Sequence, residues 1–293
     1  MLSVKTAQNI LPSIPTQESK SDDVPAKKGD YIFKTGAGEI IRLKALNTLL
    51  NRDTCDLLDR FRLEGKTILE VGCGLGIISA ELAKRVGKEG KVAAIDNSDN
   101  LLNFAREHGK EQGVSNVDYL NVDIYDIDTQ TFSQKFDVLY GRYIIVNLSN
   151  PVQAIEHLLG LLKEGGTIIL EEAILNQGFC YPPNEAYKKW QKILDVGLWK
   201  NQKDPTIGLQ LHSIFERKNI KVIEQRMIQP LLNTPEKKSL VTQSLSNSKE
   251  NTPDAPEEFV QLISELRKLE NEDCIIGSAP TMQIVGQLPN FGH

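Results

Sequence analysis

Residues 67–76 of the chain read Thr-Ile-Leu-Glu-Val-Gly-Cys-Gly-Leu-Gly, an apolar run that ends on an acid and opens into three alternating glycines. The length and β-branched content of the apolar run are typical of a parallel strand buried on both faces. Behind the glycines, apolar residues recur at helical spacing, at Ile78, Leu82 and Val86. Glycine permits positive φ and lets a ligand lie against the backbone at the start of a helix. The stretch therefore predicts a strand, a helix and, between them, a nucleotide-binding turn at Gly72, Gly74 and Gly76.

The spacing of these glycines indicates which kind of nucleotide binds. A dinucleotide fingerprint spaces its glycines G-x-G-x-x-G to hold a pyrophosphate, whereas here the third glycine comes one place early and position 77 is Ile77. Glu70, at the end of the strand, repels a pyrophosphate but holds an ammonium group, directly or through water. The ligand is expected to carry a positive charge.

A second short apolar strand is predicted at residues 91–96, and it ends on Asp96. An acid at this place accepts hydrogen bonds from ribose hydroxyls. A ribose and a cation occur together in S-adenosylmethionine. With these residues the chain resembles the class I S-adenosylmethionine-dependent methyltransferases over roughly residues 31–175: Glu70 to Gly76 is similar to their first motif, and Asp96 to their ribose-binding acid.

The resemblance implies an α/β fold with a Rossmann-like, seven-stranded, mostly parallel sheet, helices on both faces and an antiparallel last strand, plus an N-terminal helical lid and C-terminal cap insertions. Apolar runs predict the further strands at residues 117–123, 136–141, 167–172, 220–228 and 281–286. Helices are predicted at 39–61 (one or two), after Asn97-Ser98, from Pro151 to Gly165-Gly166, around Trp190 and at 257–269. Residues 233–254 are polar and rich in Ser and Asn.

Three successive predicted strands end in the acids Glu70, Asp96 and Asp123. A single Asp at a strand end is usually a cap or a turn residue, but ligands of open α/β sheets bind beyond the carboxyl ends of the strands, where the three acids converge. The resemblance implies that Asp123 binds the adenine amino group and that Ile124 packs on the ring. It also implies that Gly141 and Arg142 meet the methionine part of the cofactor, with Tyr143 and Asn147 facing the methyl group. Ordinary packing is the alternative for Tyr143.

The full set of predicted cofactor residues adds the segment before the first strand, which is similar to the lid over the methionine end of the cofactor in small-molecule methyltransferases. Core-packing helices anchored by Tyr31 are the alternative for that segment. The set comprises Tyr31, Arg42, Glu70, Gly72, Cys73, Gly74, Gly76, Asp96, Asn97, Asp123, Ile124, Gly141, Arg142 and Asn147.

The domain organisation follows from changes in composition. Residues 1–29 have the polar, proline-containing composition of a disordered tail, and residues 30–62 form the predicted lid. Residues 63–293 form the predicted methyltransferase domain, with cap insertions near 176–215 and 231–275. Aromatic residues gather in the first insertion and predict an apolar substrate pocket, or else an aromatic-filled crossover helix: Phe179, Tyr181, Tyr187, Trp190 and Trp199.

The 293 residues, 40% of them hydrophobic, suffice for one large α/β domain. A net charge of −5 and a pI near 5.6 disfavour nucleic-acid partners, because phosphate backbones require a basic face. No apolar run approaches the roughly 20 residues of a membrane span, and no signal peptide is evident, so a cytoplasmic protein without membrane contact is expected. The scattered cysteines predict free thiols and no metal site: Cys55, Cys73, Cys180 and Cys274.

The sequence thus predicts a monomeric or homodimeric enzyme that transfers a methyl group from S-adenosylmethionine to a small, largely apolar molecule and releases S-adenosylhomocysteine. Transfer to oxygen or nitrogen favours a base at the rim of the sheet, for which Glu172 and His212 are the candidates; transfer to an activated carbon needs less. Two alternatives remain: a non-catalytic cofactor-binding or interaction protein on the same fold, and a nicotinamide-dependent dehydrogenase, which the glycine spacing and Glu70 disfavour.

Overall fold

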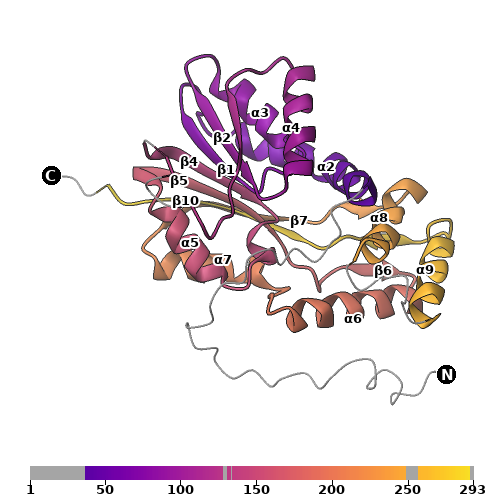
Figure 1. Ribbon diagram of the computed structural model, residues 1–293. Helices are drawn as coiled ribbons and strands as arrows, with labels where there is room; N and C mark the ends of the chain where they lie inside the picture. The colour runs from indigo at the N-terminus through magenta and orange to yellow at the C-terminus, as the bar shows by residue number, and fades with distance from the viewer. Residues whose placement is uncertain (1–36, 128–130, 133, 249–256, 291–293) are drawn as a thin grey trace.

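The computed structural model describes residues 37–127, 131–132, 134–248 and 257–290. Its central element is a seven-stranded sheet with the order β3-β2-β1-β4-β5-β10-β7 (Figure 1). The strands are β1 (Thr67–Val71), β2 (Lys91–Asp96), β3 (Val117–Asn121), β4 (Phe136–Arg142), β5 (Leu162–Ala173), β7 (Lys221–Ile228) and β10 (Thr281–Gln287). Neighbours from β3 to β5 pair in parallel, and β10 runs antiparallel to both β5 and β7. The predicted Rossmann-like sheet with an antiparallel last strand is confirmed.

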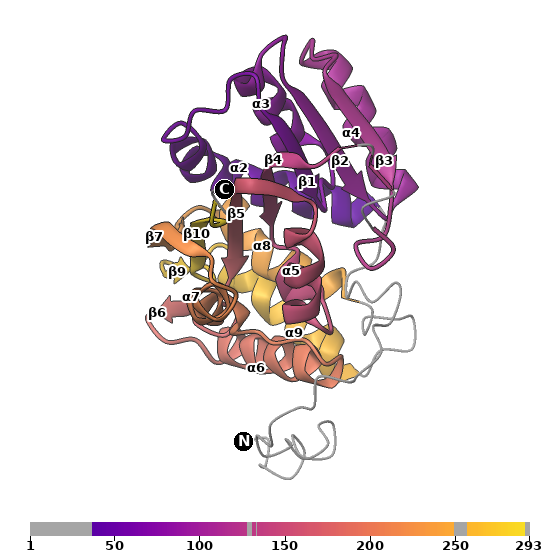
Figure 2. The same ribbon diagram turned by 90° about the vertical axis from the view of Figure 1, so that its left-hand side faces the viewer.

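Helices cover both faces of this sheet, as Figures 1 and 2 show. One face carries α2 (Ala37–Leu58), α3 (Ile77–Val86) and α4 (Asp99–Glu111), and the other carries α5 (Pro151–Leu159) and α7 (Ile207–Arg217). Alternate residues of β1 reach opposite cores: Leu69 and Val71 pack with α5 and α7, whereas Ile68 packs with α2 and α3. A strand with both faces buried explains why the sequence there is apolar without alternation.

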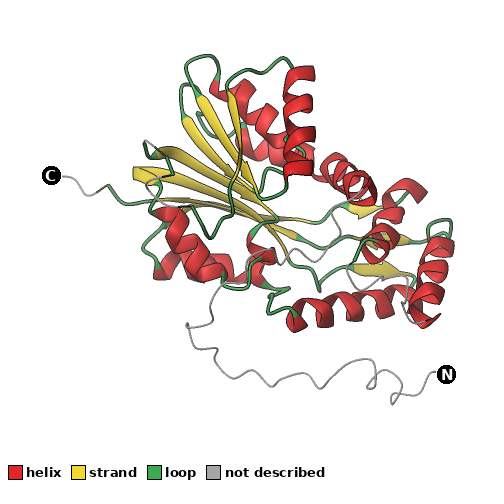
Figure 3. Ribbon diagram, in the orientation of Figure 1, coloured by secondary structure: helices red, strands yellow, loops and turns green. Residues whose placement is uncertain are grey.

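The chain leaves the carboxyl end of β5 to build a second, smaller unit (Figure 3), which we call the cap. It contains a three-stranded sheet of order β6-β9-β8 and three helices around its own apolar cluster. Its elements are β6 (Phe179–Tyr181), α6 (Glu185–Lys200), β8 (Leu231–Leu232), α8 (Pro235–Ser246), α9 (Glu257–Leu269) and β9 (Ile275–Gly277). Helix α8 contacts α2, so the cap closes against the first helix of the main unit.

The small sheet and α8 were not predicted. Helix α8 lies in the polar segment 233–254, and its buried face includes Lys238 and Thr242 beside Val241 and Leu245, which obscures the apolar period. Local signals for the start of α8 are present. The side chain of the N-cap residue Thr234 accepts a hydrogen bond from the N–H of Lys237, and a proline follows Thr234 at the first helical position. The strands of the small sheet are two and three residues long, too short for a periodic pattern.

Three element boundaries differ from the predictions. Strand β3 ends at Asn121, so Asp123 lies in the following loop and is not the last residue of the strand. Helix α5 ends at Leu159, and Gly165-Gly166 lie within β5, where a shift in the pairing with β4 accommodates extra residues. The predicted one or two helices at 39–61 are the single helix α2. The predicted tail falls outside the described residues, and the lid and cap boundaries stay predictions.

Among the described residues, no helix combines the length and the apolar character that crossing a bilayer requires.

Candidate functional site

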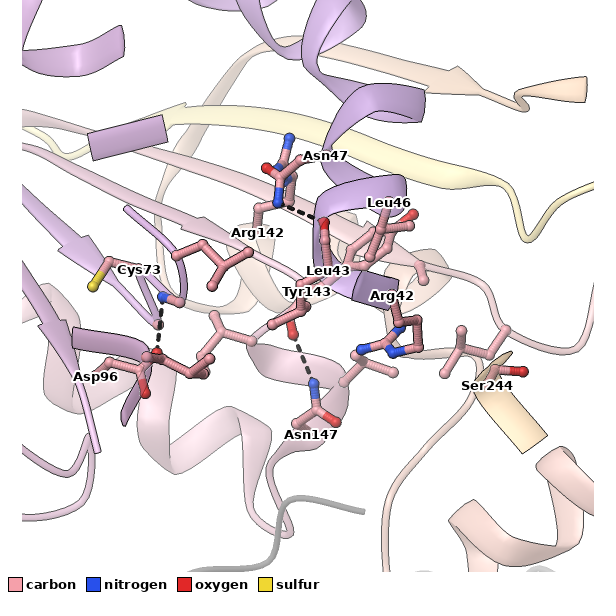
Figure 4. A pocket seen from close by; sticks show the side chains of 18 of the residues that line it. Arg42, Leu43, Leu46, Asn47, Cys73, Asp96, Arg142, Tyr143, Asn147 and Ser244 are labelled. Atoms are coloured by element: carbon pink, nitrogen blue, oxygen red, sulfur yellow. Dashed lines mark hydrogen bonds between the residues drawn. The ribbon is translucent and has the colours of Figure 1, made fainter. Parts of the chain in front are cut away.

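A cavity of about 330 Å³ lies where the carboxyl ends of the strands meet α2 and the cap. In Figure 4, Cys73 and Asp96 lie at one end, Ser244 lies at the other, and Tyr143 lies between them. The predicted cofactor residues that line the cavity are Arg42, Glu70, Gly72, Cys73, Gly74, Asp96, Asn97, Asp123, Ile124, Arg142 and Asn147. Gly76 and Gly141 are not among its lining residues, and Tyr31 lies outside the described part of the chain.

The glycine turn, residues 72–76, leaves the end of β1 with three glycines at positive φ, between 54° and 69°. A Cβ atom at Gly74 would meet nothing within 4 Å, so this position opens onto the cavity. By contrast, a Cβ atom at Gly76 would lie 2.7 Å from the Cβ of Ala105 on α4. Gly76 thus has a packing role, because its missing side chain lets α4 approach the turn, and its cofactor contact stays a prediction.

The carboxylate of Asp96 is held by the backbone around it. Its Oδ2 accepts a hydrogen bond from the N–H of Gly74 at 2.9 Å, and its Oδ1 accepts one from the N–H of Ser98 at 3.0 Å. Burial raises the pKa of Asp96, and these backbone hydrogen bonds oppose that rise. One carboxylate therefore ties the glycine turn to the end of β2 and fixes both against the cavity.

Glu70 is buried at the end of β1, where its carboxylate accepts a hydrogen bond from the hydroxyl of Ser79 on α3. Burial raises the pKa of Glu70 to about 7, while Ser79 and the charge of Arg142 oppose the rise. The group titrates close to neutral pH in the ligand-free protein. A cationic group in the cavity would favour its charged form.

The loop after β4 forms the middle of the cavity. Tyr143 has a φ of 56°, which is uncommon for a residue with a side chain. Its carbonyl accepts a hydrogen bond from Asn147 Nδ2 at 2.7 Å, and its hydroxyl lies 2.5 Å from Thr281 Oγ1. Burial raises the pKa of Tyr143 to about 12, so this hydroxyl stays protonated at neutral pH.

The structure corrects the role expected for Glu172. Its carboxylate is fully buried and accepts the N–H groups of Ile144, Ile145 and Val146 at 3.0, 2.8 and 3.1 Å. Burial raises the pKa of Glu172 to about 8, opposed by these three amides. Because the side chain does not line the cavity, it serves to anchor the loop and is not placed to act as a base.

The other expected base, His212, is also not at the cavity. It lies on α7 with a side chain 46% exposed, its Nδ1 2.6 Å from Gln225 Oε1 and its Nε2 3.5 Å from Glu216 Oε1. Its neighbour Leu211 belongs to the buried face of α7, which turns the side chain of His212 outward.

Arg142 contacts α2 through its side chain, a contact that the sequence did not indicate. The guanidinium donates to Asn47 Oδ1 at 2.5 Å, to Asn51 Oδ1 at 3.1 Å and to Thr54 Oγ1 at 2.9 Å. A second arginine that lines the cavity, Arg42 of α2, pairs with Glu39 of the same helix at 2.6 Å. Helix α2 is therefore held to the end of β4 by the hydrogen bonds that Arg142 donates to three uncharged side chains.

The cap supplies the rest of the lining, and most of it escaped sequence reasoning. From the aromatic group, Tyr187 and Trp190 line the cavity, whereas Phe179, Tyr181 and Trp199 are exposed and do not. The unpredicted lining residues on α2, after β5, on α8 and around the small sheet are Leu46, Asn47, Leu49, Leu175, Leu232, Leu240, Val241, Ser244, Ile276, Ser278 and Ala279.

No group of His, Cys, Asp and Glu side chains in the described ranges is arranged to hold a metal ion.

The sheet order, the glycine turn and the acids at the carboxyl ends of β1 and β2 define the class I S-adenosylmethionine-dependent methyltransferase fold. A family model described as a methyltransferase domain matches residues 63–226, more than half of the chain. The chain belongs to this methyltransferase family.

Relatives of known name share part of this region. Aklanonic acid methyltransferase DauC from Streptomyces sp. (strain C5) is 29% identical over 123 residues, which cover 41% of this chain and 54% of that protein. Ubiquinone biosynthesis O-methyltransferase from Coxiella burnetii (strain Dugway 5J108-111) is 32% identical over 117 residues, covering 40% and 47%. The chain thus matches about half the length of these relatives.

Solved structures share the fold at low identity. A protein from Bacillus halodurans C-125 that is assigned as a methyltransferase matches with a TM-score of 0.55 and 19% identity, over 81% of this chain and 99% of that one. The [4+2]-cyclase SpnF matches with a TM-score of 0.54 and 14% identity, over 90% and 99%. A cyclase and a methyltransferase on one fold mean that function must be argued from the site.

Proposed function

We propose that this protein transfers a methyl group from S-adenosylmethionine to a small, largely apolar molecule. The observation that carries the proposal is the continuity of one cavity, which has the glycine turn, the buried Glu70 and the half-buried Asp96 at one end and apolar cap residues at the other. Such an arrangement can hold a polar nucleoside and an apolar acceptor side by side.

The nucleoside end of the cavity fits the cofactor in three respects. Gly74 leaves open space beside the backbone, and Glu70 offers a carboxylate to an ammonium group. Tyr125, whose backbone N–H donates to Asp123 Oδ1, and Ser149 line the cavity, and within the described part of the chain their buried hydroxyls have no hydrogen-bond partner. Buried polar groups are normally satisfied, so these hydroxyls favour a polar ligand at this end.

The proposed roles follow the geometry. Asp96 accepts hydrogen bonds from the ribose, Asp123 and Ile124 hold the base, and Arg42, Arg142 and Asn147 surround the methionine part. Bound S-adenosylmethionine supplies an activated methyl group on a sulfonium. An acceptor lone pair forms the new bond to that carbon while the sulfur keeps the electron pair of the broken bond, and a hydroxyl acceptor loses its proton to water. The chain's own contribution is to align the acceptor and exclude solvent.

An oxygen acceptor is the first to test, because one relative is named as an O-methyltransferase. We further propose that the protein acts as a cytoplasmic monomer or homodimer without nucleic-acid or membrane partners, on the basis of its net charge of −5 and its composition.

Calorimetry with S-adenosylmethionine, S-adenosylhomocysteine and NADH tests the cofactor. The first two are expected to bind at micromolar affinity and NADH not to bind. Saturable NADH binding with no response to S-adenosylmethionine would support the dehydrogenase alternative instead. Cofactor binding without transfer of a labelled methyl group to any of a panel of phenols, enols and amines would favour a non-catalytic binding protein.

A further inference from the structure

Two aromatic side chains of α6 stand one helical turn apart and face the cavity. The ring centroids of Tyr187 and Trp190 are 5.2 Å apart with their planes tilted by 45°. We call them the aromatic pair. Trp199, near the end of the same helix, is 37% exposed and lies away from the cavity lining.

The polar atoms of the aromatic pair are already used within the protein. Trp190 Nε1 donates to the hydroxyl of Ser244 at 3.0 Å, and that hydroxyl donates to the carbonyl of Val241 at 2.8 Å. The Tyr187 hydroxyl donates to the carbonyl of Gly277 at 3.4 Å. Contacts with α8 and β9 thus hold both rings in place. Tyr187 is only 2% exposed, so the ring carbon atoms that can meet a ligand are those of the partly buried Trp190.

The surfaces around the aromatic pair are aliphatic. They come from α2, α6, α8, the small sheet and the loop after β5, and we call this part of the cavity the acceptor compartment: Leu46, Leu49, Leu175, Leu194, Leu232, Leu240, Val241 and Ile276. The preordered Trp190 ring, backed by Tyr187 and set among aliphatic side chains, favours a flat, apolar ligand, because ring stacking adds to the gain from burial.

The charge around the acceptor compartment excludes a cationic ligand. In the described part of the chain, the lining that comes from α2 and the cap contains no carboxylate, and its one charged side chain is Arg42, which is paired with the Glu39 carboxylate. Arg142 adds a second guanidinium at the end of β4. A cation brought there would lose hydration without gaining an opposite charge.

We infer that the methyl acceptor is a planar aromatic molecule, neutral or anionic, whose ring lies against the aromatic pair in the acceptor compartment. This inference rests on the proposed function, since it names the substrate class of the same site. It makes Trp190 a specificity-determining residue.

The experiment is calorimetry on protein saturated with S-adenosylhomocysteine. The probes are 2-naphthol, the saturated decahydro-2-naphthol of nearly the same outline, and the cation 2-naphthylmethylammonium. Wild type is expected to bind 2-naphthol about two- to tenfold more tightly than the saturated alcohol, the range that aromatic contacts add to burial. The cation is expected to bind most weakly of the three.

Variants assign the preference to Trp190. Trp190→Leu should abolish the difference between 2-naphthol and the saturated alcohol, and Trp190→Phe should restore most of it. Trp199→Leu, on the same helix, is the matched control and should behave as wild type. Unchanged affinity for S-adenosylhomocysteine shows that each variant is folded around the cofactor.

Three patterns among the probes that bind would overturn the inference. They are equal or tighter binding of the saturated alcohol to wild type, a preference that survives in Trp190→Leu, and tightest binding of the cation. Binding of S-adenosylhomocysteine with none of the probes also overturns it and leaves the proposed function intact. Failure of the wild type to bind S-adenosylhomocysteine would instead contradict the proposed function.

Discussion

Glu70 and Asp96 end neighbouring strands, yet their carboxylates have different surroundings. Glu70 accepts one side-chain hydrogen bond, from Ser79, inside the protein, whereas Asp96 accepts two backbone N–H groups at the edge of the glycine turn. A carboxylate that already organises the backbone contributes to binding both directly and through the shape of the turn.

Asp96→Ala is therefore expected to weaken S-adenosylmethionine binding by about 1.5–3 kcal/mol, the usual scale for losing charge-assisted hydrogen bonds. Calorimetry measures the change. Asp118→Asn is the matched control. Asp118 of β3 forms an exposed ion pair with Lys91 of β2, so its replacement should leave cofactor affinity unchanged. Equal affinity of wild type and Asp96→Ala for S-adenosylmethionine would show that Asp96 does not contact the cofactor.

Substitutions at Gly74 and Gly76, in the same turn, are expected to affect different properties: cofactor affinity at Gly74 and the free energy of unfolding at Gly76. Valine at Gly74 is expected to lower cofactor affinity by more than about a hundredfold, because its side chain fills cavity space, at a cost to stability of about 1–2 kcal/mol from the positive φ. Alanine at Gly76 is expected to lower the free energy of unfolding by about 2–4 kcal/mol, since its Cβ crowds Ala105 as well. Thermal unfolding and calorimetry distinguish the two. Normal cofactor binding by Gly74→Val would show that the turn does not face the ligand.

At the scale of elements, the loop after β4 is the part of the site whose shape depends most on distant contacts. Its backbone is held from β5, where Glu172 accepts three consecutive N–H groups, and from β10, where Thr281 meets the Tyr143 hydroxyl. These contacts secure a residue at positive φ in the middle of the cavity.

Glu172→Ala is expected to lower the free energy of unfolding by about 2–4 kcal/mol, because three N–H groups, two of them on buried residues, lose their acceptor. Cofactor affinity should fall with it, as Asn147 and Tyr143 lose their fixed positions. Glu164→Ala, an exposed position on the same strand, is the control and should change neither quantity. A variant of normal stability and affinity whose methyl transfer alone has lost its pH dependence would restore Glu172 as a base.

At the scale of the whole molecule, the main unit and the cap each have an apolar core, and the cavity lies between them. Placing buried carboxyl groups beside this cavity has an energetic consequence. Burial raises the pKa of Glu70 to about 7 and that of Glu172 to about 8, from an ordinary value of 4.5.

The free energy of unfolding of the ligand-free protein is therefore expected to fall between pH 5.5 and 8.5, by roughly 2–5 kcal/mol in total. Unfolded chains release these protons near pH 4.5, whereas the folded protein keeps them until pH 7 to 8, so rising pH favours unfolding in this window. Urea unfolding at the two pH values measures the drop, and Glu70→Gln should make it smaller. A free energy of unfolding that increases over this range would contradict the expected protonation of both groups.

Much of the fold and the nucleoside end of the cavity was predictable from the sequence. Glu70, Gly74 and Asp96 belong to strand–turn–helix units whose apolar period and glycine spacing are local, so the pattern along the chain indicates their place at the carboxyl ends of the strands. The family match over residues 63–226 confirms the class of protein that these residues indicated.

What only the tertiary structure decided are the contacts between segments far apart in the chain. Glu172 lies 26 to 28 residues from the amides it binds, and the sequence does not show whether an acid at a strand end turns toward a cavity or toward a loop. His212 is directed outward by the packing of Leu211, and Ser244 meets Trp190 across 54 residues. Periodicity reports which face of an element is buried, but the partner buried against it follows from how the whole chain packs.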